Sequence, residues 1–363
     1  MAVSAARSAG VAAEALAADN ADWRAAAIAM LSVRVIQGFI YWGGGSRRFI
    51  FDPSKLDPSQ PSWMANKLQT AMPGALFGLD QVLAFLLQHF WLLYAAIILF
   101  SAVELIAGFA LMAGLMTRLA ALVSIGLSIA LMLLFGWQGG TCIDEWTMAA
   151  CNLAMGATLM LAGSAAYSLD NAWLRRNPGL AGRMWFRWGG GSLKLPMSDA
   201  GFRKASIAVL AFVLVFDGGL YNYYRGSVLT PYHKGPVGAE AHHFTLSDAT
   251  LTSDGGVRFA VYLDGGTPAV PAHIMKVEVV GPDGGALATW DWQALSALSP
   301  TAIANEFAYN RVKPAPYGLE ARVGARAVVT LPPPANAETI RAGAAVRITD
   351  VDGKTFASKL TPA

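Results

Sequence analysis

The chain has 363 residues, of which 55% are hydrophobic and only 14% are charged. Soluble domains average about a quarter charged residues, so this composition indicates a membrane protein. A formal net charge of +3 gives no reason to expect a nucleic-acid partner. The two cysteines, Cys142 and Cys151, cannot build a disulfide framework. No CxxC, CxxCH or HExxH spacing occurs in the sequence, so we expect neither a metal site nor a haem.

Five apolar runs have the length needed to cross a bilayer. They lie at about residues 25–45, 91–115, 119–135, 146–167 and 205–221. The Ala-rich tail before them, residues 1–24, shows no small-residue cleavage site, so we expect an uncleaved first span. We therefore predict a helical membrane domain over residues 25–167 and a further membrane helix over residues 205–222.

The lysines and arginines of the connectors indicate how the chain crosses the membrane. Arg118 marks one short connector, and seven basic residues crowd the linker 168–204. Both regions are cytoplasmic if the N-terminus is cytoplasmic. The outer face then receives the loop 46–90, the loop between the third and fourth spans, and residues 223–363.

The loop 46–90 carries basic residues that run against this rule, namely Arg47, Arg48, Lys55 and Lys67. Positive charge kept on the outer face indicates an anionic ligand, and a wrong topology is the alternative explanation. The same loop contains an apolar segment, residues 75–87, which predicts an interfacial or re-entrant helix. Long connectors of this kind are usually functional, so we expect the loop 46–90 to form a lid over the outer ends of the helices.

Residues 223–363 lack apolar runs and alternate between apolar and polar positions in short segments. Turn clusters such as Asp254-Gly255-Gly256 separate these segments. Period-two segments at this spacing predict an all-β sandwich domain.

The loop between the third and fourth spans, GWQGGTCIDEW, holds more reactive side chains than a plain connector needs. Cys142 lies in this loop and is our candidate redox thiol, with a buried inert cysteine as the alternative. Asp144 and Glu145 fit the first turn of the next helix and would handle protons. Cys151 is nine positions farther on, about 13 Å along a helix, so we expect a small packing residue instead of a disulfide partner.

Two neighbours of this cysteine, Trp137 and Gln138, are candidates for the wall of a substrate pocket. A membrane-interface belt is the alternative explanation for the tryptophan. At the outer end of the first span, Gly44 and Gly45 would present backbone amides, and Arg47 and Arg48 would supply guanidinium groups. Oxyanions are bound by such groups, whereas simple anchoring of the helix end to lipid headgroups is the alternative.

Charged residues inside the spans are costly and indicate function. Arg34 and Glu104 lie at similar depths in the first two spans, so we expect them to pair. Gln37 and Tyr41 share the helix face of Arg34 and extend a polar stripe outward. The stripe would serve a quinone headgroup or a proton path, in which His89 could also move protons. A purely structural link between two helices is the alternative.

The loop and following helix, GWQGGTCIDEWTMAACNLAMG, and the YWGGGSRRF end of the first span resemble the DoxD subunit of thiosulfate:quinone oxidoreductase, a relative of the DoxX membrane family. The last span and the β domain resemble the DoxA subunit. The resemblance implies a fusion of the two: a DoxX-like four-helix bundle, a fifth membrane helix and a C-terminal β-sandwich. It implies a bacterial inner-membrane enzyme with a periplasmic C-terminal domain.

The activity implied by this resemblance is oxidation of thiosulfate to tetrathionate, with two electrons passed to membrane quinone as the acceptor substrate. In the simplest covalent route, Cys142 adds to the quinone and thiosulfate, bound by Arg47 and Arg48, attacks its sulfur. Alternatives are a non-enzymatic membrane scaffold that anchors the β domain to a redox partner and, more weakly, a thiosulfate transporter. A homo-oligomer is compatible with the sequence.

Overall fold

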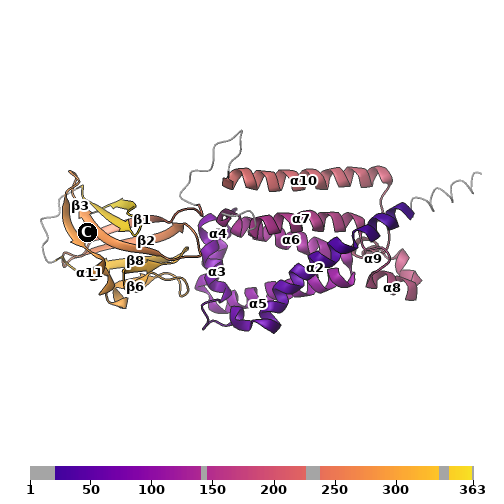
Figure 1. Cartoon of the computed structure of the whole chain (residues 1–363), viewed down its shortest axis with the longest axis horizontal. Coiled ribbons are helices and arrows are strands. Elements are labelled where there is room, and N and C mark those ends of the chain that lie inside the picture. Colours follow the sequence, from indigo (N-terminus) through magenta and orange to yellow (C-terminus); the bar gives the residue numbers. More distant parts are fainter. Residues whose placement is uncertain (1–20, 140–144, 226–237, 335–342, 362–363) are drawn as a thin grey trace, which may run out of the picture. The chain divides into compact units, whose positions relative to one another are not determined.

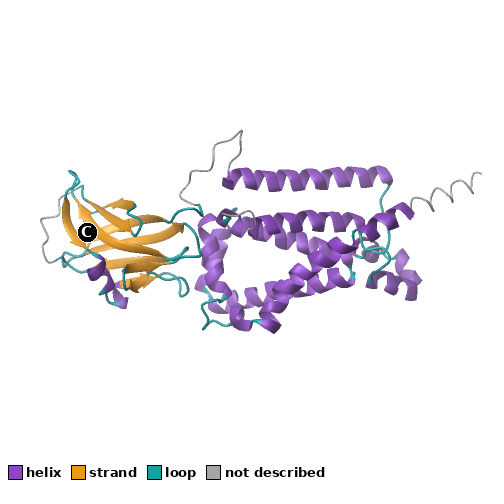
Figure 2. Ribbon diagram, viewed as in Figure 1, coloured by secondary structure: helices purple, strands orange, loops and turns teal. Residues whose placement is uncertain are grey.

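The computed structural model describes residues 21–139, 145–225, 238–334 and 343–361. The N-terminal half consists of helices, and the C-terminal region consists of two antiparallel sheets (Figures 1 and 2). Contacts divide the chain into two units. The first contains Met1–Leu56, Ala96–Met132 and Glu145–Tyr223, and the second contains Asp57–Ala95, Leu133–Asp144 and Tyr224–Ala363.

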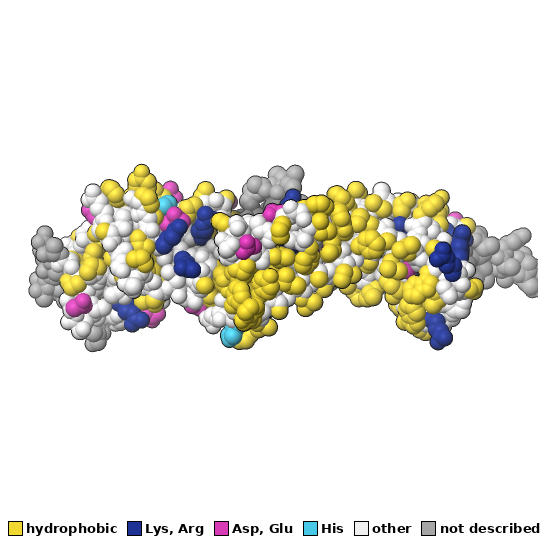
Figure 3. All heavy atoms as spheres, turned by 90° about the horizontal axis from the view of Figure 1, so that it is seen from below, with side chains coloured by type: hydrophobic (Ala, Val, Ile, Leu, Met, Phe, Trp, Pro, Cys, Tyr) yellow, Lys and Arg dark blue, Asp and Glu magenta, His cyan; other side chains and the backbone are white. Residues whose placement is uncertain are grey.

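The long helices of the chain are apolar along most of their length. They are α2 (Leu31–Ser46) with its continuation η1 (Arg47–Phe51), α5 (Phe90–Ala113), α6 (Thr117–Phe135), α7 (Glu145–Ala162) and α10 (Asp199–Arg225). The face of the helical part in Figure 3 is covered largely by hydrophobic side chains. Exposed Leu99, Ile106 and Phe109 on α5 are of this kind. Such a surface fits lipid and is unusual in contact with water.

Within the described residues, three helices are long and apolar enough to cross a membrane: α5, Thr117–Gln138 and Asp199–Tyr224. A fourth candidate combines Ala21–Ala29 with Leu31–Phe51, two pieces bent by 42°. The remaining predicted span corresponds to α7, whose apolar part, Trp146–Ala162, is shorter than expected. The described residues thus contain three or four candidate spans, which supports the expectation of a helical membrane protein, and the count of five spans stays a prediction.

The core of the first unit lies where α2, α5, α6 and α7 meet. Its buried residues include Tyr41, Leu111, Ala121, Leu127 and Leu159. Glycines allow α2 and α5 to approach closely, because a Cβ on Gly38 would lie 2.7 Å from the Gly108 carbonyl oxygen. The linker after α7 folds into short helices. These are α8 (Leu169–Arg176), η5 (Pro178–Gly182) and α9 (Met184–Gly189).

The C-terminal domain is all-β apart from short helical turns, as predicted. One sheet has the order β1 (His243–Leu251), β2 (Val257–Gly265), β8 (Arg326–Leu331) and β5 (Ile303–Asn305). The other has the order β10 (Thr355–Lys359), β9 (Ala345–Asp350), β3 (Ala272–Val280), β7 (Gly318–Ala321) and β6 (Lys313–Ala315), with β4 (Ala286–Trp290) on β3. The helical turns are α11 (Trp292–Ser296) and η6 (Pro300–Ala302). Alternate residues such as Phe259, Val261 and Leu263 are buried, as period two requires.

The second unit also contains short helices from the segment before α5. They are α3 (Met64–Ala71), η3 (Met72–Gly74) and α4 (Leu79–Gln88), whereas η2 (Pro53–Leu56) belongs to the first unit. The apolar segment 75–87 does form a helix, α4. Leu83 and Leu87 are buried on one of its faces, whereas Val82 and Phe85 are exposed. Its proposed role as a lid stays a prediction.

Helix α3 is joined to the β domain through the fully buried amide of Gln69. Its Nε2 donates to the carbonyls of Asn310 and Gly324, each at 2.9 Å, and its Oε1 accepts from the Asn310 backbone N–H at 2.8 Å. Asn310 in turn donates from Nδ2 to the Asn66 carbonyl at 2.9 Å. Every polar atom of the Gln69 amide therefore has a partner, which buried polar groups require. Such a satisfied pair fixes how the β domain sits on α3.

We expect Gln69→Leu to destabilise this unit. The substitution removes three hydrogen bonds and leaves buried groups of Asn310 and Gly324 without partners. Each such group costs about 1–3 kcal/mol, so the free energy of unfolding falls by roughly 3 kcal/mol or more. Thermal unfolding of the detergent-solubilised protein measures the change.

The matched control is Gln88→Leu, which removes only an exposed hydrogen bond to Glu306. A loss below about 0.5 kcal/mol is expected there. Equal unfolding temperatures for the two variants would show that Gln69 does not join α3 to the β domain.

Candidate functional site

Basic side chains gather where α2 ends and η1 begins. The Arg48 Nη1 forms an ion pair with Glu104 Oε2 of α5 and lies 3.5 Å from the Ser101 hydroxyl. The guanidinium carbon lies 6.0 Å from the centre of the Phe100 ring. Both members of the ion pair are mostly buried, at 13% and 12% side-chain exposure. Arg48 is therefore held in one orientation by three residues of α5.

Arg47 and Lys55 complete this basic cluster. The Arg47 side chain is exposed, and Lys55 is half-buried. Burial, together with the positive charges of Arg47 and Arg48, lowers the pKa of the Lys55 ammonium. Asp52 is exposed nearby, and its hydrogen bond from Ser54 lowers its carboxyl pKa, with Lys55 and Arg47 adding to the effect. Three cations thus face two carboxylates, which leaves the cluster positive and suited to an anion.

The predicted pairing of Arg34 with Glu104 is wrong. Arg34 donates instead to the Tyr167 carbonyl, and Glu104 pairs with Arg48. Glu104 faces Gly44, ten residues farther along α2 than Arg34, which is about 15 Å at helical rise. The depth estimate took Gly45 as the end of the helix, whereas the helix continues to Phe51, and these six residues account for about 9 Å of the difference.

Gly44 and Gly45 do not form the turn of free backbone amides that was expected. Both lie inside α2, where amides bond within the helix. Their lack of a side chain serves packing: a Cβ on Gly44 would overlap the Glu104 carboxylate, and one on Gly45 would overlap Leu105. These glycines therefore allow α5, including Glu104, to pack closely against α2.

The polar stripe on α2 is buried, as its spacing predicts. Gln37 Nε2 donates to Ser124 Oγ at 3.1 Å and to the Asn152 carbonyl at 2.8 Å. Tyr41 donates to the Ser124 carbonyl at 3.0 Å, and its hydroxyl lies 2.7 Å from Ser128 Oγ. The stripe thus links α2 to α6 and α7 across the core.

Several buried polar atoms along this stripe have no hydrogen-bond partner among the described residues. They are Nε and Nη1 of Arg34, Oε1 of Gln37 and Oδ1 of Asn152. All three residues are at most 3% exposed. Buried polar groups are normally satisfied, so these atoms call for water or for polar groups of a ligand.

The redox loop is only partly described. Cys142 and Asp144 lie outside the described residues, and Glu145 is described only as the first residue of α7. Their roles stay predictions. Cys151, expected to pack inside the protein, is exposed on α7.

Trp137 and Gln138 bind the end of α3. The Trp137 indole is buried and donates from Nε1 to the Ala71 carbonyl at 3.0 Å. Gln138 Nε2 donates to the Thr70 carbonyl at 2.6 Å and to its hydroxyl at 3.1 Å. They satisfy carbonyls that the end of a helix leaves unpaired. Their side-chain donors are thus engaged, and their role in a pocket wall stays a prediction.

His89 lies exposed between α4 and α5. Its Nδ1 lies 2.7 Å from the Phe85 carbonyl, and its ring packs at 4.3 Å from the Phe85 ring. One ring nitrogen is thereby oriented. A proton-transfer role for this histidine stays a prediction.

Sequence reasoning missed two buried charges at the α8 and α9 end of the helical unit. Asp170 accepts from the backbone N–H groups of Met116, Thr117 and Gly191 and from the Thr117 hydroxyl. Arg118 donates to four backbone carbonyls, those of Met160, Arg187, Gly190 and Leu193. For Asp170 the signal in the sequence was an acid two residues after Ser168, the N-cap of α8.

Among the described residues, no group of three or more His, Cys, Asp or Glu side chains could hold a metal ion.

Two family models match the chain, and no solved structure matches it. One, described as the TQO small subunit DoxD, matches residues 29–191. The other, described as the TQO small subunit DoxA, matches residues 239–359. The first match contains the basic cluster and the polar stripe, and the second contains the β domain. The chain therefore belongs to the DoxD and DoxA families of thiosulfate:quinone oxidoreductase small subunits, which it joins in one polypeptide.

Proposed function

We propose that this protein oxidises thiosulfate to tetrathionate on the outer face of a bacterial inner membrane and passes the electrons to membrane quinone. The observation that carries the proposal is the basic cluster of Arg47, Arg48 and Lys55. Thiosulfate is a small dianion, and guanidinium groups bind such oxyanions through paired hydrogen bonds. The family membership supports the same substrate and acceptor.

Arg48 and Arg47 have different roles in this proposal. Glu104 neutralises and orients Arg48, so its guanidinium is positioned before the substrate arrives. Arg47 and Lys55 supply the excess charge that attracts the dianion. The reaction needs no change in the net charge of this cluster, since tetrathionate carries the same charge as one thiosulfate.

The chemical step that we propose uses Cys142 as nucleophile. Its thiolate adds to the quinone, and thiosulfate then attacks the cysteine sulfur. The hydroquinone leaves with the electron pair of the broken bond and takes up two protons. The first thiosulfate is then bound to Cys142 through a disulfide-type bond, as an S-thiosulfonate. A second thiosulfate attacks the outer sulfur of that bond, forms tetrathionate and releases the Cys142 thiolate. Asp144 or Glu145 would transfer the protons.

Quinone headgroup binding or proton transfer is proposed for the polar stripe of Arg34, Gln37 and Tyr41. Among the described residues the Nε and Nη1 donors of Arg34 and the Oε1 acceptor of Gln37 have no partner, which supports it: a quinone carbonyl can accept from Arg34, and water can donate to Gln37. Glu104 and His89 stay candidates for proton transfer. We also propose a periplasmic C-terminal domain and a cytoplasmic N-terminus, which Arg118 and the basic residues of the linker 168–204 support.

Arg47→Ala is expected to raise the KM for thiosulfate at least roughly tenfold, since a hydrogen bond to a charged group contributes about 1.5–3 kcal/mol. Steady-state quinone reduction measures it. Arg175→Ala, an exposed arginine on α8 outside the cluster, is the control and should leave the KM unchanged. Equal KM values for both variants would remove the cluster from the substrate site.

The lowered pKa of Lys55 predicts a pH dependence of thiosulfate binding. Below that pKa the ammonium is charged and attracts thiosulfate, and above it the amine is neutral. The KM should therefore rise as the pH increases through the lowered pKa. Lys55→Arg stays charged and should flatten the profile. Parallel profiles for the parental protein and Lys55→Arg would contradict this role.

Cys142→Ser should abolish quinone reduction by thiosulfate, because a serine hydroxyl is a far weaker nucleophile than a thiolate. The other cysteine of the chain supplies the control: Cys151→Ser, on the exposed face of α7, should retain parental activity. Near-parental turnover in Cys142→Ser would refute the covalent mechanism while leaving the anion site intact.

A further inference from the structure

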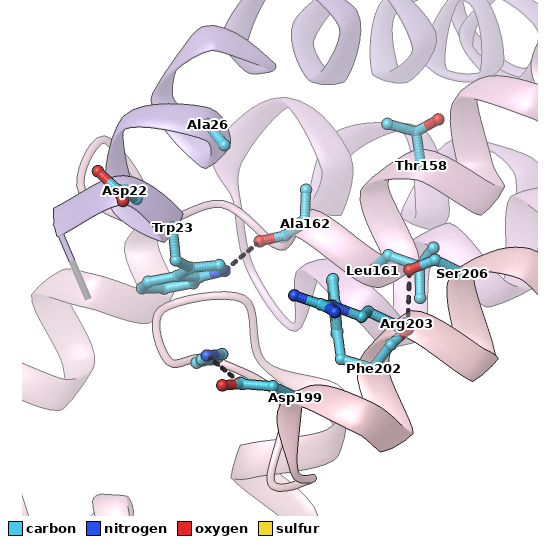
Figure 4. Close-up of a pocket in the computed structure, with 11 residues that line it drawn as sticks. Asp22, Trp23, Ala26, Thr158, Leu161, Ala162, Asp199, Phe202, Arg203 and Ser206 are labelled. Carbon is cyan, nitrogen blue, oxygen red and sulfur yellow. Dashed lines mark hydrogen bonds and ion pairs between the residues drawn. The ribbon is translucent and has the colours of Figure 1, made fainter. Parts of the chain in front are cut away.

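A cavity of about 530 Å³ with charged and apolar walls opens near the N-terminus of α10 (Figure 4). Its walls come from the last turn of α7, the first turns of α10 and the helix Ala21–Ala29, all within the helical unit. This volume lies in the range of small-molecule sites, about 300–1,000 Å³. None of its residues belongs to the basic cluster or the polar stripe.

The charged residues that line this cavity balance one another. They are Lys194 and Arg203, which are positive, and Asp22 and Asp199, which are negative. Lys194 Nζ lies 2.9 Å from Asp199 Oδ1. A bare phosphate or an anionic headgroup matches this neutral lining poorly, whereas a zwitterion carrying both a phosphate and an ammonium matches it.

The apolar part of the cavity is formed by aromatic and aliphatic side chains. The Trp23 indole forms one wall and is fixed by donation from Nε1 to the Ala162 carbonyl at 3.0 Å. Leu161 and Phe202 also line it. Tryptophan is enriched at membrane interfaces, where its ring meets the headgroup level. This mixture of polar and apolar walls fits the boundary between a headgroup and its acyl chains.

Helix α10 presents an exposed apolar surface on which acyl chains can lie. Only 6% of the apolar stretch of α10 is buried, against 28% for α5 and 39% for the helix Thr117–Gln138. Ile207, Leu210 and Leu214 are exposed and recur at helical spacing on α10. At its other end, Tyr221 contacts Trp146 of α7, with ring centres 5.5 Å apart. Helix α10 thus has an apolar surface that begins at the cavity and continues along the helix.

From this charge balance and the apolar surface beside it, we propose that the cavity binds the headgroup of a zwitterionic phospholipid with a primary ammonium, of the phosphatidylethanolamine type. Arg203 and Lys194 bind the phosphate, and Asp22 and Asp199 accept hydrogen bonds from the ammonium. The acyl chains lie along α10 and hold it beside α7.

Thermal unfolding in lipid nanodiscs of defined composition tests this proposal. Nanodiscs of phosphatidylcholine with added phosphatidylethanolamine should raise the unfolding temperature by about 3 °C over phosphatidylcholine alone. Phosphatidylcholine is the matched lipid, because its quaternary ammonium has the same charge but no N–H donors. Added phosphatidylglycerol or inorganic phosphate should give no such shift.

The double variant Arg203→Gln/Lys194→Gln should lose the shift, whereas Arg175→Gln/Arg176→Gln on α8 should keep it. Native mass spectrometry of the parental protein should show retained phosphatidylethanolamine, which keeps the test decisive even where the double variant fails to fold. The proposal would be overturned if phosphatidylglycerol or inorganic phosphate raised the unfolding temperature as much as phosphatidylethanolamine does. It would also be overturned if the unfolding temperature in phosphatidylcholine alone equalled that with added phosphatidylethanolamine. An unchanged shift in the double variant would overturn it as well.

Discussion

The carboxylate of Glu104, set in the apolar helix α5, is the constraint on which the basic end of the helical unit depends. A charge in such surroundings needs a partner, and removing the partner of a buried charge costs about 3–5 kcal/mol. Arg48 is that partner. Because Gly44 and Arg48 are four residues apart on one helix, both face Glu104. Gly44 leaves space for the Glu104 carboxylate, and Arg48 neutralises its charge. Extension of α2 through η1 then places Arg47 beside Arg48.

At the opposite end of the same unit, buried charged side chains are satisfied by backbone groups instead of by an ion pair. Asp170 and Arg118 bind backbone groups there, and each satisfies several helix ends or loop carbonyls. The donors of Arg118 and the acceptors of Asp170 are used by the backbone, so these two side chains have little capacity for a ligand. At the basic end, by contrast, Arg47 is exposed and the local charge is unbalanced. This difference is the physical reason for assigning anion binding to the Arg47 end.

The elements with strong periodicity could be predicted from the sequence. Alternation and turn clusters predicted the β domain, and the apolar segment that became α4 was recognised as a helix. The end of α2 could not be placed, because consecutive glycines disfavour a helix in isolation. In the protein they are retained in the helix because α5 packs against them. That error contributed to the wrong prediction of Arg34, in place of Arg48, as the partner of Glu104. The contact between Gln69 and Asn310 joins residues 241 positions apart, and no local sequence pattern predicts it.

The most direct test of thiosulfate oxidation by this chain is an assay of the purified single chain with thiosulfate and a soluble quinone, following both products. Balanced chemistry predicts that one tetrathionate appears for each quinone reduced and that Arg47→Ala slows both at low thiosulfate. Absence of turnover from a folded, membrane-reconstituted protein, or quinone reduction without tetrathionate, would contradict this function. The first outcome would favour a membrane scaffold for a separate redox partner.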